Sequence, residues 1–290
     1  MSKKHPVVAV TGSSGAGTTT VKRAFEHIFY RDGIKPAVVE GDSFHRYTRV
    51  EMREKVTAGL SHFGPEANHF DKIAELFKTY GETGGGEKRY YLHSPEEAAE
   101  HNARLKCDKQ PGEFTPWEQI EGNTDLLFYE GLHGMVVNGD VDVAKNVDLG
   151  VGVVPIVNLE WIQKIFRDNA ERGYSQEAIV DTIMRRMPDY INHITPQFSR
   201  TDINFQRVPT VDTSNPFIAR DIPTPDESFV VIRFSDPKKF DINFPYLLSM
   251  IDCSFMSRRN SIVVPGGKMG FAMEIILQPI IEQMMDARNV

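Results

Sequence analysis

The sequence predicts an α/β fold in which a mostly parallel sheet is covered by helices on both faces. Two observations support this prediction. Short apolar, β-branched runs alternate with stretches of helical periodicity along the first half of the chain. Polar residues follow directly after several of these runs, as they do at the ligand-binding carboxyl edge of open α/β sheets. The chain has 290 residues and no clear linker, so we expect one domain spanning 1–290.

The expected elements follow one another in a regular order. Buried parallel strands are predicted at 7–10, 37–40, 126–129 and 150–156. Helices are predicted at 18–30, 159–172, 175–193 and 270–287. Three further strands are predicted at 205–211, 229–234 and 261–264. Few helices separate these last three strands, so we expect them to extend the sheet in antiparallel fashion.

Composition excludes several classes of protein. The 33 Lys and Arg residues against 40 Asp and Glu residues give a net charge of −7, which argues against broad nucleic-acid binding. No apolar run approaches the length of a membrane span, and the first residues lack the apolar core of a signal peptide. Cys107 and Cys253 form no C-x-x-C pair and no disulfide framework. We therefore expect a cytoplasmic protein with reduced cysteines.

Residues 12–19 match the phosphate-binding pattern G-x-x-x-x-G-K-[ST] at every position except Thr18, which replaces the lysine. A predicted strand precedes the loop and a predicted helix follows it, as the motif requires. In that arrangement backbone N–H groups converge on phosphate, and the hydroxyl of Thr19 binds magnesium. The expected nucleotide-binding residues are Gly12, Ser13, Ser14, Gly15, Ala16, Gly17, Thr18, Thr19 and Thr20. The simpler alternative is a glycine-rich turn that binds nothing.

The missing lysine leaves two alternatives open. That lysine normally places a positive charge on the β- and γ-phosphates. Either another side chain supplies the charge, or the protein binds a nucleotide without catalysis.

Asp42 follows the predicted strand at 37–40 and is suited to accept the proton of an attacking hydroxyl. The alternative, equally favoured by position, is a residue that caps the next segment. His45, Arg46 and Arg49 follow it closely and form a cationic group suited to a substrate phosphate. An isolated histidine is more often structural, so His45 is the weakest member of this group.

Glu130 ends the apolar run at 126–129, where a magnesium-binding strand carries its acidic residue. Acidic residues are common at strand ends. In a chain that also has the glycine loop, a role at magnesium or at a water molecule is the better interpretation.

Lys164, Arg167, Asp168 and Arg172 lie on one side of the predicted helix at 159–172. Such a face is usually a solvated surface with i,i+4 ion pairs. Three cations beside a nucleotide site are also what a phosphoryl-transfer transition state requires. We therefore hypothesise that Lys164 replaces the missing loop lysine.

These segments together resemble the bacterial (class I) phosphoribulokinases along essentially the whole chain. The segments that carry the resemblance are 10–20, 40–46, 129–133 and 164–168. The resemblance implies a P-loop nucleoside triphosphate hydrolase-like, adenylate kinase-like fold with three α/β/α layers. It also implies transfer of the ATP γ-phosphate to the 1-hydroxyl of ribulose 5-phosphate in the Calvin cycle. Bacterial members share the threonine at the loop lysine position, so Thr18 does not indicate a dead enzyme.

The resemblance also implies a role for each candidate residue. Asp42 would be the catalytic base and would share Mg²⁺ with Glu130 and Thr19. Lys164 and Arg167 would stabilise the transferring phosphoryl group, with Asp168 near the metal or substrate. The residues expected to bind the sugar phosphate are His45, Arg49 and Arg172.

Regulation is expected from the resemblance alone. Bacterial relatives are typically homo-oligomers that NADH activates and AMP inhibits. The candidate effector contacts are Arg31, Arg233, Arg258 and Arg259. The redox cysteine of the plant enzymes is replaced here by Ala16, so thioredoxin switching through the loop is not expected.

Two other functions compete with this one. A uridine-kinase-like enzyme would share the loop, the aspartate and the Arg167-Asp168 pair, but a neutral nucleoside would not require the cations near His45. A nucleotide-binding regulator would bind ATP without transferring phosphate.

Overall fold

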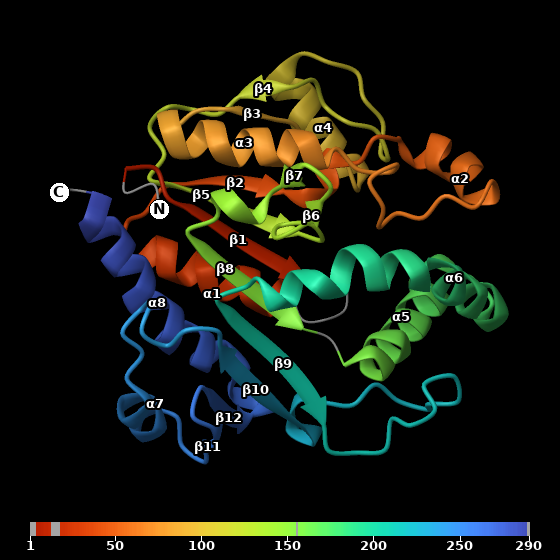
Figure 1. Ribbon diagram of the computed structural model, residues 1–290. Helices are drawn as coiled ribbons and strands as arrows, with labels where there is room; N and C mark the ends of the chain where they lie inside the picture. Colours follow the sequence, from red (N-terminus) through yellow and green to blue (C-terminus); the bar gives the residue numbers. More distant parts are fainter. Residues whose placement is uncertain (1–3, 13–17, 155, 289–290) are drawn as a thin grey trace.

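A computed structural model describes residues 4–12, 18–154 and 156–288 of the chain. Its centre is an eight-stranded mixed sheet with the strand order β11-β12-β10-β9-β8-β1-β5-β2 (Figure 1). The strands are β1 Val7–Gly12, β2 Pro36–Glu40, β5 Leu126–Gly131, β8 Leu149–Val154, β9 Ile203–Pro209, β10 Ser228–Phe234, β11 Phe255–Arg258 and β12 Ser261–Pro265. Each predicted strand is present, and β11 is an addition.

The prediction that the strand near 205–211 is antiparallel is wrong. β9 pairs in parallel with β8, with Val151 opposite Ile203. The direction reverses only at β10, which pairs antiparallel with β9 and β12. The physical reason is the connection between β8 and β9. The chain leaves the carboxyl end of β8, passes through two helices and re-enters the sheet at the opposite edge, as a parallel crossover does.

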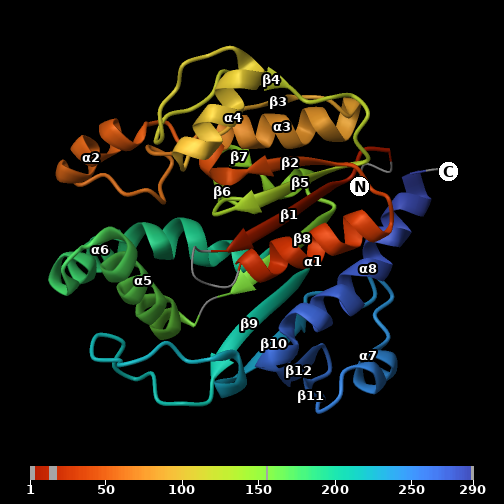
Figure 2. The same ribbon diagram turned by 180° about the vertical axis from the view of Figure 1, so that it is seen from behind.

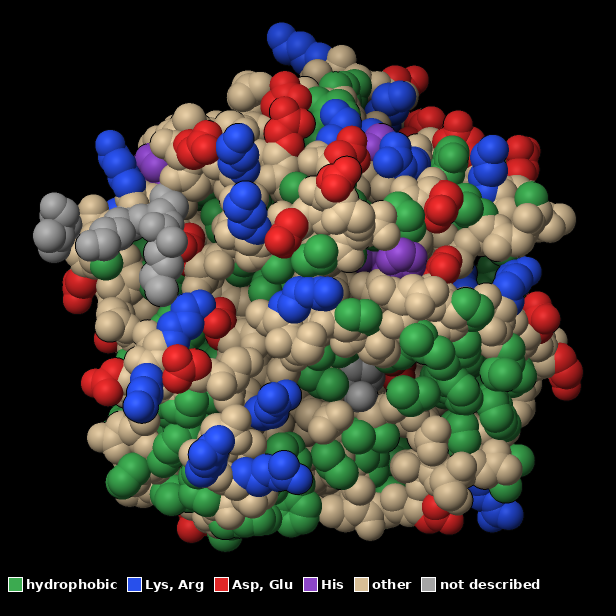
Figure 3. Space-filling model, in the orientation of Figure 1, with side chains coloured by type: hydrophobic (Ala, Val, Ile, Leu, Met, Phe, Trp, Pro, Cys, Tyr) green, Lys and Arg blue, Asp and Glu red, His purple; other side chains and the backbone are tan. Residues whose placement is uncertain are grey.

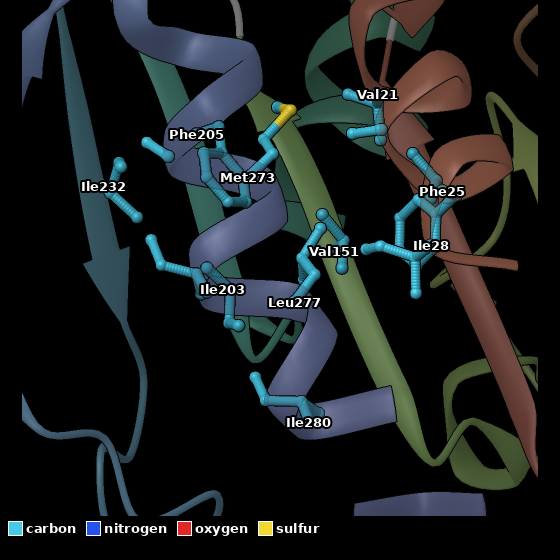
Figure 4. Packing of buried hydrophobic residues seen from close by; sticks show 14 of the residues in the cluster. Val21, Phe25, Ile28, Val151, Ile203, Phe205, Ile232, Met273, Leu277 and Ile280 are labelled. Atoms are coloured by element: carbon cyan, nitrogen blue, oxygen red, sulfur yellow. The ribbon is translucent and has the colours of Figure 1, made fainter. Parts of the chain in front are cut away.

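The two faces of the sheet have separate cores. Along β1, Val8 and Val10 face the helices α1 Thr18–Arg31 and α8 Met269–Arg288, whose buried side chains interdigitate with those of β8, β9 and β10 (Figures 2 and 4). Val7 and Ala9 face the opposite way, toward α3 Phe70–Thr83. This period-two alternation places one helical layer on each face and confirms the three-layer prediction.

The remaining helices lie outside this frame. They are α2 Arg49–Thr57, α4 Pro95–Leu105, α5 Val157–Arg172, α6 Gln176–Asp189 and α7 Phe244–Met250. The predicted helix at 175–193 is α6 continued by a π-helical turn, Tyr190–Ile194, just beyond Pro188. Short hairpins are formed by β3 Glu87–Lys88 with β4 Glu118–Gln119, and by β6 Val137–Asn138 with β7 Val141–Asp142. In the described ranges, no helix is both long and apolar enough to span a membrane.

Two helical projections extend past the carboxyl ends of the parallel strands. α2 forms one of them, and the hairpin of α5 and α6 forms the other (Figure 1). A small cluster of Ile165, Ile179 and Ile183 holds α5 against α6. The space between the projections is therefore the place where the predicted site residues should meet.

Gly12 must be glycine because β1 and β8 approach closely at the start of the phosphate loop. A Cβ there would lie 2.9 Å from both the Cβ and the carbonyl oxygen of Val153. We expect Gly12→Ala to lower the free energy of unfolding by about 1–3 kcal/mol, measured by urea denaturation. Gly122→Ala is the matched control, because nothing lies within 4 Å of its Cβ position. Equal midpoints for the two variants would contradict the packing argument.

Candidate active site

A cleft of about 1010 Å³ opens between the two helical projections. Asp42 lines it from the turn after β2, Arg49 from α2 and His93 from the segment before α4. Lys164 and Arg186 line it from α5 and α6. In the space-filling view, this part of the molecule carries exposed histidine and cationic side chains (Figure 3). The cleft therefore brings together acidic and basic groups that are far apart in the sequence.

The turn that carries Asp42 lies directly on β5. It is a 3-10 turn at Gly41–Phe44. A Cβ on Gly41 would come within 2.6 Å of the Tyr129 hydroxyl and 2.8 Å of the Gly131 Cα, so only glycine allows this approach. The N-caps of the turn and of the next helix are Glu40 and Thr48. The alternative interpretation of Asp42 as a capping residue is therefore wrong.

Asp42 faces two histidines. Its Oδ1 lies 3.3 Å from His45 Nε2, and its Oδ2 lies 3.9 Å from His93 Nε2. Partial burial alone would raise the pKa of Asp42, but the hydrogen bond and charge of His45 outweigh it and hold that pKa below its usual value. Asp42 is consequently ionised at neutral pH, as a proton acceptor must be.

Asn68 fixes the orientation and protonation of His45. The Asn68 amide nitrogen donates to the carbonyl oxygens of His62 and Gly64, at 2.7 and 2.8 Å. Its Oδ1, 2.7 Å from His45 Nδ1, therefore accepts a hydrogen bond from that nitrogen. Burial lowers the pKa of His45, but the bonds to Asp42 and Asn68 raise it overall. These two acceptors favour the doubly protonated ring of His45, whose Nε2 faces the Asp42 carboxylate.

The predicted basic group on α5 forms one wall of the cleft. Lys164 donates to Asp168, one turn further along the helix, and Arg167 Nη2 lies 3.2 Å from the same carboxylate. Asp168 is only 3% exposed. Burial lowers the pKa of Lys164, and the Asp168 carboxylate partly offsets this effect. The geometry brings these three residues together, while their catalytic roles stay predictions.

The cationic group after Asp42 divides in the structure. His45 and Arg49 line the cleft, and Arg49 Nε donates to the Tyr91 hydroxyl at 3.3 Å. Arg46 instead donates to the carbonyl oxygens of Pro65 and Asn68. Arg46 therefore braces the neighbouring loop.

Glu130 lies at the carboxyl edge of the sheet, one strand from the phosphate loop. It is opposite Val10 of β1 and Glu40 of β2 in the sheet register. Among the described residues, no three side chains gather as a protein cage for a metal. Mg²⁺ commonly takes only one or two carboxylates and completes its shell with phosphate and water. The carboxylates of Glu130 and Asp42, at this edge, fit that donor set.

The described residues include only part of the predicted loop. Ser13, Ser14, Gly15, Ala16 and Gly17 lie outside the described residues, as do the side chains of Thr18, Thr19 and Arg172. Gly12 ends β1 at the cleft side of the sheet. Thr20 is in the first turn of α1, where its methyl group lies 3.7 Å from the Cβ position of Gly270. The nucleotide-binding assignments stay predictions.

The predicted effector arginines divide into two places. Arg233 on β10 and Arg258 on β11 both lie opposite Ser261 of the strand between them, and Arg259 is next in sequence. Arg31 ends α1, where its Nε lies 3.3 Å from Asp32 Oδ1. The described contacts thus group three of the four arginines on one part of the sheet.

Sequence reasoning missed several residues of the cleft. They are Arg53, His62, Tyr91, His93, Glu160, Arg185 and Arg186. Of these residues, only Arg185 and Arg186 are indicated by the sequence. They are adjacent arginines on the predicted helix at 175–193 and add positive charge near the basic residues of α5. His62 belongs to no recognisable sequence motif. Burial and the charge of Arg186 lower the pKa of His62 to about 3, so its side chain is neutral in the cleft.

Comparison with known proteins gives a consistent result. The model of the phosphoribulokinase / uridine kinase family matches residues 7–214. Phosphoribulokinase of Xanthobacter flavus is 61% identical over 296 aligned positions, covering 100% of this chain and 99% of the relative. The chromosomal phosphoribulokinase of Cupriavidus necator is 59% identical with the same coverage. The solved phosphoribulokinase structure from Rhodobacter spheroides has a TM-score of 0.88 and 52% identity, covering 99% of this chain and 100% of that one.

Proposed function

Because the chain belongs to the phosphoribulokinase / uridine kinase family, in which it is a kinase, we propose that it phosphorylates ribulose 5-phosphate at the 1-hydroxyl. ATP is the donor, and the products are ADP and ribulose 1,5-bisphosphate. The observation that carries the choice of acceptor is the cationic lining of the cleft around the ionised Asp42. A doubly charged sugar phosphate complements these cations, whereas a neutral nucleoside brings no negative charge to them. We place the product in carbon fixation by the Calvin cycle.

In the proposed reaction, the 1-hydroxyl attacks the γ-phosphorus and loses its proton to an Asp42 oxygen. Lys164 and Arg167 stabilise the charge on the transferring group, and Lys164 replaces the loop lysine missing at Thr18. Asp168 holds both cations in place, as its contacts with them indicate.

The acceptor phosphate is assigned to Arg49 and Arg172, with His45 contributing through its charge. Both ring nitrogens of His45 already face a partner, Asn68 on one side and Asp42 on the other. A direct bond from His45 to phosphate would break one of these contacts. His45 therefore mainly orients Asp42 in this scheme.

Magnesium would be held by Glu130, Asp42 and the hydroxyl of Thr19. When bound, it neutralises charge on the β- and γ-phosphate oxygens.

We further propose a homo-oligomer that NADH activates and AMP inhibits. The candidate effector contacts are Arg31, Arg233, Arg258 and Arg259.

A coupled assay for ADP tests the choice of acceptor. We expect turnover with ribulose 5-phosphate. With unphosphorylated ribulose, kcat/KM should be lower by about 10⁴-fold, because this acceptor lacks the phosphate that the cations of the cleft bind. Uridine should give no turnover above the ATPase background. Preference for uridine would instead support a nucleoside kinase. ATP binding with no transfer to any of the three acceptors would indicate a regulator.

A further inference from the structure

Arg89 connects a peripheral segment of the chain to the turn that carries Asp42. It directly follows β3, in the segment that lies over α3 together with α4 and β4 (Figure 1). Its side chain crosses to the turn after β2, where Nε donates to the carbonyl oxygen of Ser43 at 2.7 Å and Nη2 donates to that of His45 at 2.6 Å. Both bonds have the short lengths of charge-assisted hydrogen bonds.

Two aromatic rings determine the plane of this guanidinium. Its Cζ lies 3.8 Å from the ring centre of Phe114 and 4.6 Å from that of Trp117. Trp117 in turn packs against Phe44 of the turn, with 5.7 Å between ring centres. Burial lowers the pKa of Arg89 to about 10, so it stays charged at neutral pH. The rings orient the fork of donors toward the two carbonyl groups.

Arg89 completes the hydrogen bonding of the turn. The Glu40 carbonyl accepts from the Ser43 hydroxyl, and the Asp42 carbonyl accepts from the His45 amide. The Phe44 carbonyl accepts from the His69 amide at 2.9 Å. Among the hydrogen bonds of the described residues, only those from Arg89 reach the carbonyls of Ser43 and His45, and a buried carbonyl without a donor is costly. The Arg89 guanidinium therefore donates to both carbonyl oxygens, which belong to the residues before and after Phe44.

We propose that Arg89 is a positioning residue for phosphoryl transfer: by fixing the carbonyls of Ser43 and His45, it holds the Asp42–His45 pair in its reactive geometry. The inference rests on the proposed function, because it assigns Asp42 as the base. Arg89 touches neither Asp42 nor the cleft, and it acts through the backbone on both sides of Phe44. A lysine keeps the charge but cannot serve both carbonyls with a fixed fork.

The test compares Arg89→Met, Arg89→Lys and Arg89→Ala with wild type. We expect kcat of Arg89→Met to fall by about 10²-fold, as a displaced catalytic group implies, with KM for ATP changed less than twofold. Arg89→Lys should be intermediate. Millimolar guanidinium should restore part of the turnover of Arg89→Ala, because the Phe114 and Trp117 rings that contact the Arg89 guanidinium can bind that planar ion. Hydrogen exchange of the peptide 41–47 should rise in Arg89→Met.

Arg104→Met is the matched control. Arg104 lies in the same segment, 5.5 Å from the ring centre of Tyr90, and binds Glu118 at 2.6 and 3.0 Å without contacting the turn. We expect it to leave kcat and exchange at 41–47 unchanged. Equal effects of Arg89→Met and Arg104→Met, or loss of kcat without faster exchange at 41–47, would overturn the proposal. If Arg89→Met does not fold, Arg89→Lys carries the same comparison.

The two proposals fail separately. If wild type does not phosphorylate ribulose 5-phosphate, the proposed function is wrong, and exchange at 41–47 alone decides whether Arg89 fixes the turn. If wild type is active and Arg89→Met keeps its kcat, the positioning role is wrong and the proposed function stands.

Discussion

Replacing Lys164 with methionine is expected to lower kcat by about 10³-fold or more while preserving the fold. A cation placed on the transferring phosphoryl group contributes on this scale in other phosphoryl-transfer enzymes. The loss should be large here because Thr18 leaves the phosphate loop without its own lysine. The fold should survive because Arg167 remains 3.2 Å from Asp168, so the buried carboxylate keeps a cationic partner. Coupled assays with circular dichroism as the folding check provide both measurements.

Lys78→Met is the control for removal of a lysine from a helix. Lys78 is exposed on α3, outside the cleft lining. We expect it to retain wild-type turnover. Near-normal kcat in Lys164→Met would show that the loop charge comes from elsewhere and would refute the assignment of Lys164.

Replacing Asp42 with asparagine is expected to lower kcat by about 10²-fold or more, because the amide cannot accept the hydroxyl proton. The free energy of unfolding should change by no more than about 1 kcal/mol, since the side chain is 44% exposed and its ion pair with His45 is partly solvated. Steady-state kinetics and urea denaturation measure the two effects separately.

Asp71→Asn is the matched control for Asp42→Asn. Asp71 also pairs with a cation and a histidine, Arg46 at 3.7 Å and His69 at 3.8 Å, but it does not line the cleft. It should keep kcat within a small factor of wild type. An Asp42→Asn variant that loses stability but keeps turnover would mean that Asp42 is structural.

The parallel part of the sheet could be predicted because burial on both faces leaves a strong signal. Val7 through Val10 are all buried, alternating between the α1 and α3 sides, so the run is apolar throughout. The direction of β9 leaves no such signal. A strand near 205–211 has the same side-chain alternation in either direction, and only the return of the chain through α5 and α6 makes it parallel to β8.

The same contrast applies to the site. Asp42, Glu130 and the α5 group follow strands or share a helical face, so local spacing indicates them. Asn68 and Arg89 act on the turn from 23 and 46 residues away, through bonds to His45 and to the Ser43 carbonyl. Nothing in the local pattern marks such partners, because the contacts exist only once α3 and the β3–β4 segment have packed on the sheet.

The most direct test of the proposed function follows the acceptor atom itself. Ribulose 5-phosphate labelled with ¹³C at C1 is incubated with ATP, Mg²⁺ and the protein, and the C1 signal is recorded by NMR with and without ³¹P decoupling. We predict that C1 acquires coupling to phosphorus in step with ADP formation, and that Asp42→Asn slows both together. ADP formation with an uncoupled C1 signal, or no ADP at all, would contradict phosphorylation at the 1-hydroxyl.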